Sequence, residues 1–159
     1  MPFAYAIVSI PATPLTSHAT PNTENPNLVL RQATRGFDLS SIAVLGRAAA
    51  GTTLTGIGFK VRRWTTAGSG GTAITPSPRR IGTTATTTAA DSATVITPGT
   101  VSGAYQASFG CGSSSPGGWM ARDTDAMIHV EGGSSDELSI NSVSGVASML
   151  LDVGAEILE

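Results

Sequence analysis

The chain has 159 residues, of which 13% are charged and 40% hydrophobic, and it contains 19 glycines and 9 prolines with a formal net charge of −2. Such an apolar, weakly charged composition excludes an intrinsically disordered chain, and the negative charge argues against bulk binding of nucleic acid. A single lysine, Lys60, is atypical of helical proteins. We therefore expect one all-β domain, long enough to bury a core.

The two halves of the chain differ in charge. Residues 1–80 contain eight Lys or Arg against two acids, and residues 81–159 contain one Arg against nine acids. Either strands from both halves intermix in space, so that the charges cancel, or the surface is bipolar and suits head-to-tail contact between copies.

Cysteine usage and segment lengths predict a soluble protein. Cys111 is the single cysteine, so no internal disulfide forms, which fits a reducing compartment. The N-terminus lacks the basic region of a signal peptide. No stretch approaches the ~20 apolar residues that a membrane helix requires, and we expect no membrane contact.

The N-terminal part begins with a short β-prone run, residues 3–10, followed by a segment that contains Pro11, Pro14, Pro21 and Pro26. These prolines exclude a helix and a regular inner strand, so residues 1–27 are predicted to form an extended arm before a β-sandwich domain at 28–159. The arm either wraps its own domain or reaches a neighbouring subunit. In the second case, its three large apolar side chains would dock there: Phe3, Tyr5 and Ile7.

The clearest strand signal is residues 54–66, after two predicted strands at 28–34 and 37–45 that Gly36 separates. Ile57, Phe59 and Val61 alternate along it and are expected in the core. The opposite face carries Lys60, Arg62 and Trp64 and is therefore cationic and aromatic. Arg63 lies on the same side as the core residues.

Further strands are predicted toward the C-terminus. Residues 74–82 form an edge segment because of Pro76 and Pro78, residues 92–97 and 101–110 read as strands, and Tyr105 shares the parity of Phe109. Residues 125–133, 136–143 and 146–158 read as three consecutive antiparallel strands joined by short turns. About eight strands suit a two-sheet antiparallel β-sandwich, similar to a jelly roll.

No catalytic or metal-binding motif stands out. His18 and His129 belong to no HExxH pattern, and His129 with Glu131 reads as a solvated pair. Cys111 has no predicted base beside it. Asp123 and Asp125 start like a calcium loop, but apolar residues follow them, so a turn with Arg122 is favoured. We expect no enzyme, no cofactor and no metal.

Surface residues carry the remaining signal. Lys60, Arg62, Arg63 and the Arg79-Arg80 pair either protect sheet edges from unwanted pairing or, with Trp64, form a partner interface, because Arg and Trp are enriched at binding hot spots. Trp119, in a glycine-rich turn, is either a core residue or a contact.

The chain resembles the small all-β capsid decoration (cement) proteins of tailed bacteriophages. The resemblance lies in the Pro/Thr-rich start and in four stretches: ATRGFDLSSIAVLG, GIGFKVRRWTTAGSGG, DAMIHVEGG with DELSINSV, and VASMLLDVGAEILE. It implies a virion protein on the capsid surface, made in the host cytoplasm and often trimeric. Such a protein bridges subunits of the major capsid protein without catalysis or a cofactor. The alternatives are a tail, fibre or host-glycan-binding β-module of a virion, and a cellular or enzymatic all-β domain.

Overall fold

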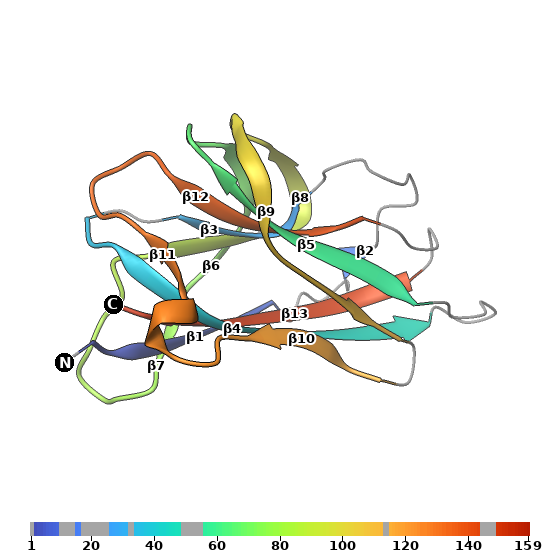
Figure 1. Cartoon of the computed structure of the whole chain (residues 1–159), viewed down its shortest axis with the longest axis horizontal. Helices are drawn as coiled ribbons and strands as arrows, with labels where there is room; N and C mark the ends of the chain where they lie inside the picture. The colour runs from blue at the N-terminus through green and yellow to red at the C-terminus, as the bar shows by residue number, and fades with distance from the viewer. Residues whose placement is uncertain are drawn as a thin grey trace.

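The computed structural model describes residues 2–9, 15–16, 26–31, 34–48, 56–112, 115–143 and 149–159. These residues form two antiparallel sheets packed face to face as a sandwich (Figure 1). The predicted all-β sandwich is therefore confirmed. The described part of the chain includes one three-residue 3-10 turn, η1 (Thr124–Ala126), and no helix in it is long and apolar enough to cross a membrane.

Sheet A has the order β10-β4-β13-β1-β7, and β11 and β2 pair with β4 and β13. Its strands are β1 (Ala4–Ser9), β2 (Leu15–Thr16), β4 (Phe37–Ala48), β7 (Ser77–Pro78), β10 (Gly117–Met120), β11 (Ile128–Val130) and β13 (Met149–Leu158). Sheet B has the order β6-β8-β3-β12-β5-β9. Its strands are β3 (Pro26–Arg31), β5 (Ile57–Trp64), β6 (Ser69–Ile74), β8 (Thr88–Thr97), β9 (Val101–Cys111) and β12 (Glu137–Ser142).

The predicted number of about eight strands is too low for the described residues. The strands that were not predicted are β2, which has two residues, and β6 and β10, whose sequences SGGTAI and GGWM are rich in glycine. A two-residue strand shows no alternation, and glycine is atypical of strand interiors. The edge prediction for residues 74–82 is confirmed, because Pro78 lies in β7 at the border of sheet A.

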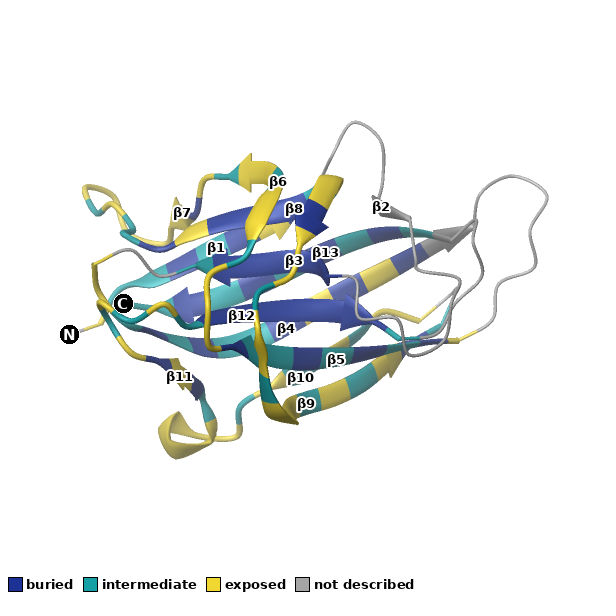
Figure 2. Ribbon diagram, turned by 90° about the horizontal axis from the view of Figure 1, so that it is seen from above, coloured by how far each residue is buried: buried dark blue, intermediate teal, exposed yellow. Residues whose placement is uncertain are grey.

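The core lies between the two sheets and is built from alternate residues of the long strands (Figure 2). Ile57, Phe59 and Val61 of β5 enter it as predicted, and the Phe59 ring stacks on Phe109 of the neighbouring strand at a centroid distance of 5.3 Å. Trp119 packs against this core from β10. A stacked aromatic pair across two strands stabilises their register.

Strand β1 corrects the prediction of a separate arm over residues 1–27. It pairs with β13 from Ala4 to Ser9 and with β7 on its other side. Tyr5 and Ile7 are 2% and 0% exposed, so they fill the core of their own domain instead of docking on a neighbour. Residues 10–14 and 17–25 of the predicted arm lie outside the described residues.

The predicted C-terminal meander is wrong in its pairing. β11 and β13 lie in sheet A, whereas β12 lies in sheet B between β3 and β5. Alternation shows which side chains are buried but not which strand is the partner. The short turn at 132–135 was therefore predicted to close a hairpin, although it connects a strand of sheet A to a strand of sheet B. β13 likewise lies between β4 and β1.

This interleaving brings opposite charges from the two halves of the chain together. Arg31 pairs with Glu137 at 3.2 Å and Arg79 with Glu156 at 2.8 Å, and Arg63 pairs with Asp136 at 3.2 Å. Each pair joins a cation of residues 1–80 to an acid of residues 81–159. The charges of the two halves therefore meet in space, as the first of the two interpretations expects.

Short connections force sheet B to curl. β5 and β6 lie four strands apart, about 19 Å in a flat sheet with a spacing of ~4.8 Å. Residues 65–68, which join them, reach at most about 17 Å, and residues 98–100 between β8 and β9 reach about 14 Å. The two edges of sheet B must therefore approach each other where these connections run. The connections are in contact, because Thr65 N–H donates to Thr100 O at 2.8 Å.

Two neighbouring residues of β1 give a matched stability test. Ile7→Ala removes a fully buried side chain and should lower the free energy of unfolding by about 2–5 kcal/mol. Val8 is 52% exposed, so Val8→Ala should change it by less than about 0.5 kcal/mol. Urea unfolding followed by circular dichroism measures both. Equal effects of the two substitutions would contradict the placement of β1 in the core.

Candidate functional site

The cationic face of β5 lies on the outer side of sheet B, as its alternation predicts. Lys60 Nζ and Arg62 Cζ each lie 3.8 Å from the centroid of the Tyr105 ring, and Arg62 Nη1 donates to Gly103 O at 2.7 Å. Tyr105 is 39% exposed. We call Lys60, Arg62 and Tyr105 the cation–tyrosine patch, in which two cations are held against one partly exposed ring.

A bulge in β9 brings Tyr105 to this face. Val61 pairs with Ala107 and Arg63 pairs with Ser102, so the four residues 103–106 stand opposite Arg62 alone, and β9 has three extra residues here. The bulge changes the side on which residues before it point. The sequence prediction that Tyr105 lies on the side of Phe109 is therefore wrong, because a regular period was assumed across the bulge.

Trp64 shares the outer face with Lys60 and Arg62, but it is 1% exposed and is not available as a contact residue. It packs with Val29 and Ile96 in a second, smaller core on the outside of sheet B. Gly68 of the crossing connection lies directly over it, since a Cβ at Gly68 would come within 2.6 Å of the indole ring. The curl of sheet B thus buries a residue that the local pattern places in solvent.

A carboxylate holds this crossing connection in place. Glu137 is 4% exposed; it accepts a hydrogen bond from Gly68 N at 3.1 Å and pairs with Arg31. Burial raises the pKa of Glu137, and the Gly68 and Arg31 contacts oppose that rise. Its role is structural, because Arg31 lies in β3 of the curled sheet and Gly68 lies in the connection that crosses it.

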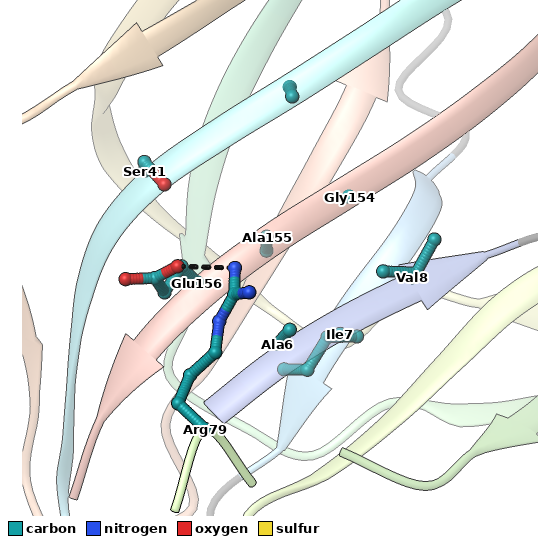
Figure 3. Close-up of a pocket in the computed structure, with 9 residues that line it drawn as sticks. Ala6, Ile7, Val8, Ser41, Arg79, Gly154, Ala155 and Glu156 are labelled. Atoms are coloured by element: carbon teal, nitrogen blue, oxygen red, sulfur yellow. Dashed lines mark hydrogen bonds and ion pairs between the residues drawn. The ribbon is translucent and has the colours of Figure 1, made fainter. Parts of the chain in front are cut away.

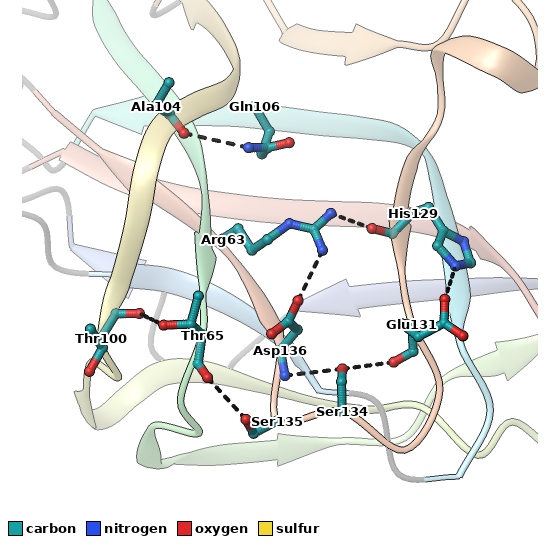
Figure 4. A network of polar contacts seen from close by, with 10 residues as sticks. All are labelled: Arg63, Thr65, Thr100, Ala104, Gln106, His129, Glu131, Ser134, Ser135 and Asp136. Carbon is teal, nitrogen blue, oxygen red and sulfur yellow. Dashed lines mark hydrogen bonds and ion pairs between the residues drawn. The ribbon is translucent and has the colours of Figure 1, made fainter.

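Arg63, on the core side of β5, belongs to a polar network between the sheets (Figure 4). Its guanidinium pairs with Asp136 at 3.2 Å and donates to the carbonyl oxygen of His129. The crossing loop is fixed further by Ser134, whose hydroxyl donates to Glu131 O, and by Ser135, whose hydroxyl donates to Thr65 O. Arg63 therefore joins β5 to the β11–β12 connection, and its side chain remains 23% exposed.

His129 lies between two carboxylates on the outside of sheet A. Nδ1 is 2.7 Å from Asp38 Oδ1 and Nε2 is 3.2 Å from Glu131 Oε2. The hydrogen bonds to Asp38 and then to Glu131 raise the pKa of His129 above its usual value. The predicted solvated pair with Glu131 is present, and the pairing of β11 with β4 adds Asp38.

The His129 cluster predicts a pH dependence of stability. A raised folded pKa means that the stabilisation is complete below the unfolded pKa of about 6.5 and is lost as pH rises through the folded value. Urea midpoints should therefore fall modestly between pH 5.5 and 8.5, and His129→Gln should show a smaller fall. Identical pH profiles for the two proteins would show that this cluster contributes nothing.

Arg79 and Arg80 follow edge strand β7 beside the start of β1. Arg79 pairs with Glu156 of β13 across the outer face of sheet A (Figure 3), and Arg80 lies 5.8 Å from the ring centroid of Phe3, which itself packs against the core. Of the predicted interface residues, the structure brings Phe3 near this pair and Lys60 near Arg62. These two groups lie on different sheets.

The outer face of sheet A carries a feature that the sequence did not indicate. Val8, Gly154, Ala43 and Gly118 form one row across four paired strands. Val8 in this row is 52% exposed, and Leu45 and Met120 beside the row are 42% and 76% exposed. Each of these residues reads as an ordinary surface position in its own strand. Only the pairing of strands distant in the chain assembles an exposed apolar face.

The candidate chemical residues occupy structural positions. Asp123 caps η1, where its Oδ1 accepts from Ala126 N at 3.0 Å, and Asp125 lies in that turn. Cys111 is buried at the core edge, and burial raises its pKa. Within the part of the chain that the structure describes, no cluster of three or more His, Cys, Asp or Glu residues is arranged to hold a metal ion.

Comparisons with protein-family models, with curated proteins and with solved structures give no match.

Proposed function

We propose that this protein is a structural component of a tailed-phage virion that decorates the capsid and stabilises it by bridging major capsid subunits. The strand order supports a jelly-roll description: β1, β13, β4 and β10 in one sheet face β3, β12, β5 and β9 in the other. β6, β7 and β8 are then an insertion between β5 and β9, the fourth and fifth of these eight strands. Jelly rolls are typical of viral capsid proteins, lectins and cupins.

The placement of aromatic side chains favours a structural role over glycan binding. A glycan-binding module presents aromatic rings on loops, whereas Trp64 lies in the second core and Trp119 packs against the main one. The interior between the sheets is filled by aliphatic and aromatic side chains such as Tyr5, Phe37 and Leu39. This packing supports a solid sandwich whose function lies on its surface.

The cation–tyrosine patch is the surface we propose for contact with the capsid, and it is the observation that carries this proposal. Arg and Tyr are residue types that concentrate binding energy, and β5 holds Lys60 and Arg62 in a fixed orientation over the ring. Copies of the protein, a trimer in the leading hypothesis, would attach around a symmetry axis. Binding to the assembled shell alone would stabilise it by mass action.

Charge reversal tests the patch. Lys60→Glu should weaken binding about two- to fivefold at low salt and less at high salt, because exposed charge pairs contribute ~0.5–1 kcal/mol and are screened. Arg122→Glu is the matched control, since Arg122 lies in an exposed turn outside the patch. Cosedimentation with empty capsids assembled from the cognate major capsid protein measures both. Failure of the wild type to cosediment would refute the capsid role, and equal losses in the two variants would refute the patch.

A further inference from the structure

An isoleucine is displayed at the tip of the turn formed by residues 80–83, which we call the Ile81 turn. Ile81 is 100% exposed. Gly82 adopts φ +86°, a conformation that glycine accepts without steric cost, and the Thr83 hydroxyl donates to Arg80 O at 3.0 Å. The turn therefore holds an aliphatic side chain in water, directly after two arginines.

The base of this turn is fixed to the sandwich. Arg79 N–H donates to Ala4 O at 2.9 Å, and the Arg79 side chain pairs with Glu156. Arg80 lies over the Phe3 ring. Little conformational freedom is lost when a surface anchored in this way binds a partner, which favours its use as a contact.

A complementary depression lies on the outer face of sheet A. It has a volume of about 280 Å³. Gly154 and Ala43 line it along the row described above, with Val8, Leu45 and Pro116 beside them, and Asp152 is the carboxylate in this lining. The aliphatic lining suits one branched apolar side chain.

The turn and the depression lie at opposite ends of β1. The Ile81 turn is anchored at Phe3 and Ala4, whereas the depression begins at Val8. Four to five extended residues separate them, about 15 Å, and the intervening strand is held between β13 and β7. The turn therefore cannot fold into the depression of its own chain, but it can enter that of another copy.

We propose that the Ile81 turn of one copy inserts into the Val8–Leu45–Gly154 depression of the next. Each copy then contributes one turn and one depression. A contact of this kind is heterologous, and it closes into a ring or continues as a filament according to the rotation between copies. It extends the proposed capsid role, and it is tested without a capsid.

Sedimentation velocity of the purified full chain over a range of concentrations tests the contact. Ile81→Asp charges the tip, and Gly154→Val fills the depression, where a Cβ would lie 3.6 Å from its nearest neighbour, Ile7 O. Val95→Asp is the matched control, because Val95 is an 84% exposed aliphatic residue at a different site. We expect concentration-dependent oligomers of the wild type and of Val95→Asp, and at least tenfold weaker association of the other two variants.

A mixture distinguishes this contact from a symmetric one. Ile81→Asp retains the depression and Gly154→Val retains the turn, so equal amounts should form a one-to-one dimer and no larger species. A wild type that is monomeric at every concentration, association that survives Ile81→Asp, equal loss in Val95→Asp, or no dimer in the mixture would each overturn the proposal. Circular dichroism checks folding, and Leu45→Asp, at a 42% exposed position, replaces Gly154→Val in both arms if that variant does not fold.

Discussion

The lengths of two connections determine much of this structure. Residues 65–68 and 98–100 each join strands that lie four positions apart in sheet B, and neither can span a flat sheet. The sheet therefore curls onto its own outer face. As a result, every residue of β12 is buried, and Glu137 can bond the passing backbone at Gly68. Without these short connections the outer face of sheet B would lie in solvent, as one face of an antiparallel sheet commonly does.

Sheet A has no comparable cover over its described residues, and this difference divides the molecule into two unlike sides. Its outer face keeps small side chains at the centre, at Gly154 and Ala43, with exposed aliphatic residues around them. Sheet B presents the cation–tyrosine patch beside its curled end. Because the two surfaces belong to opposite sheets, a single copy has room for lateral contact with its own kind and for attachment to a different partner.

The sequence was sufficient for features that depend on a strand's own period. The alternation of β5 predicted which side chains enter the core and that Lys60, Arg62 and Trp64 share the other face. It did not predict the burial of Trp64, because Val29, Ile96 and Gly68 cover it from other strands and connections. The burial of such an outward-facing side chain depends on strands and connections that are distant in the sequence, and the period of its own strand carries no information about them.

Two other errors share that physical origin. The bulge at residues 103–106 breaks the period of β9, so Tyr105 reaches the cations of β5. The last three strands were expected to pair with one another, but β11 pairs with β4, and β12 and β13 each insert between strands from much earlier in the chain. The sequence analysis placed residues 74–82 in an edge segment and did not predict the Ile81 turn, and the depression on sheet A exists only after β1, β13 and β4 have paired.

The two ends of the described chain meet at one pole of the sandwich. Phe3 N–H donates to Glu159 O at 2.7 Å, and Glu159 N–H donates to Phe3 O at 3.0 Å (Figure 1). A short linker between them would give a circular permutant, with new ends opened in a surface loop. Arg80 rests on Phe3 at this pole, so a bulky fusion at either end would crowd the Ile81 turn.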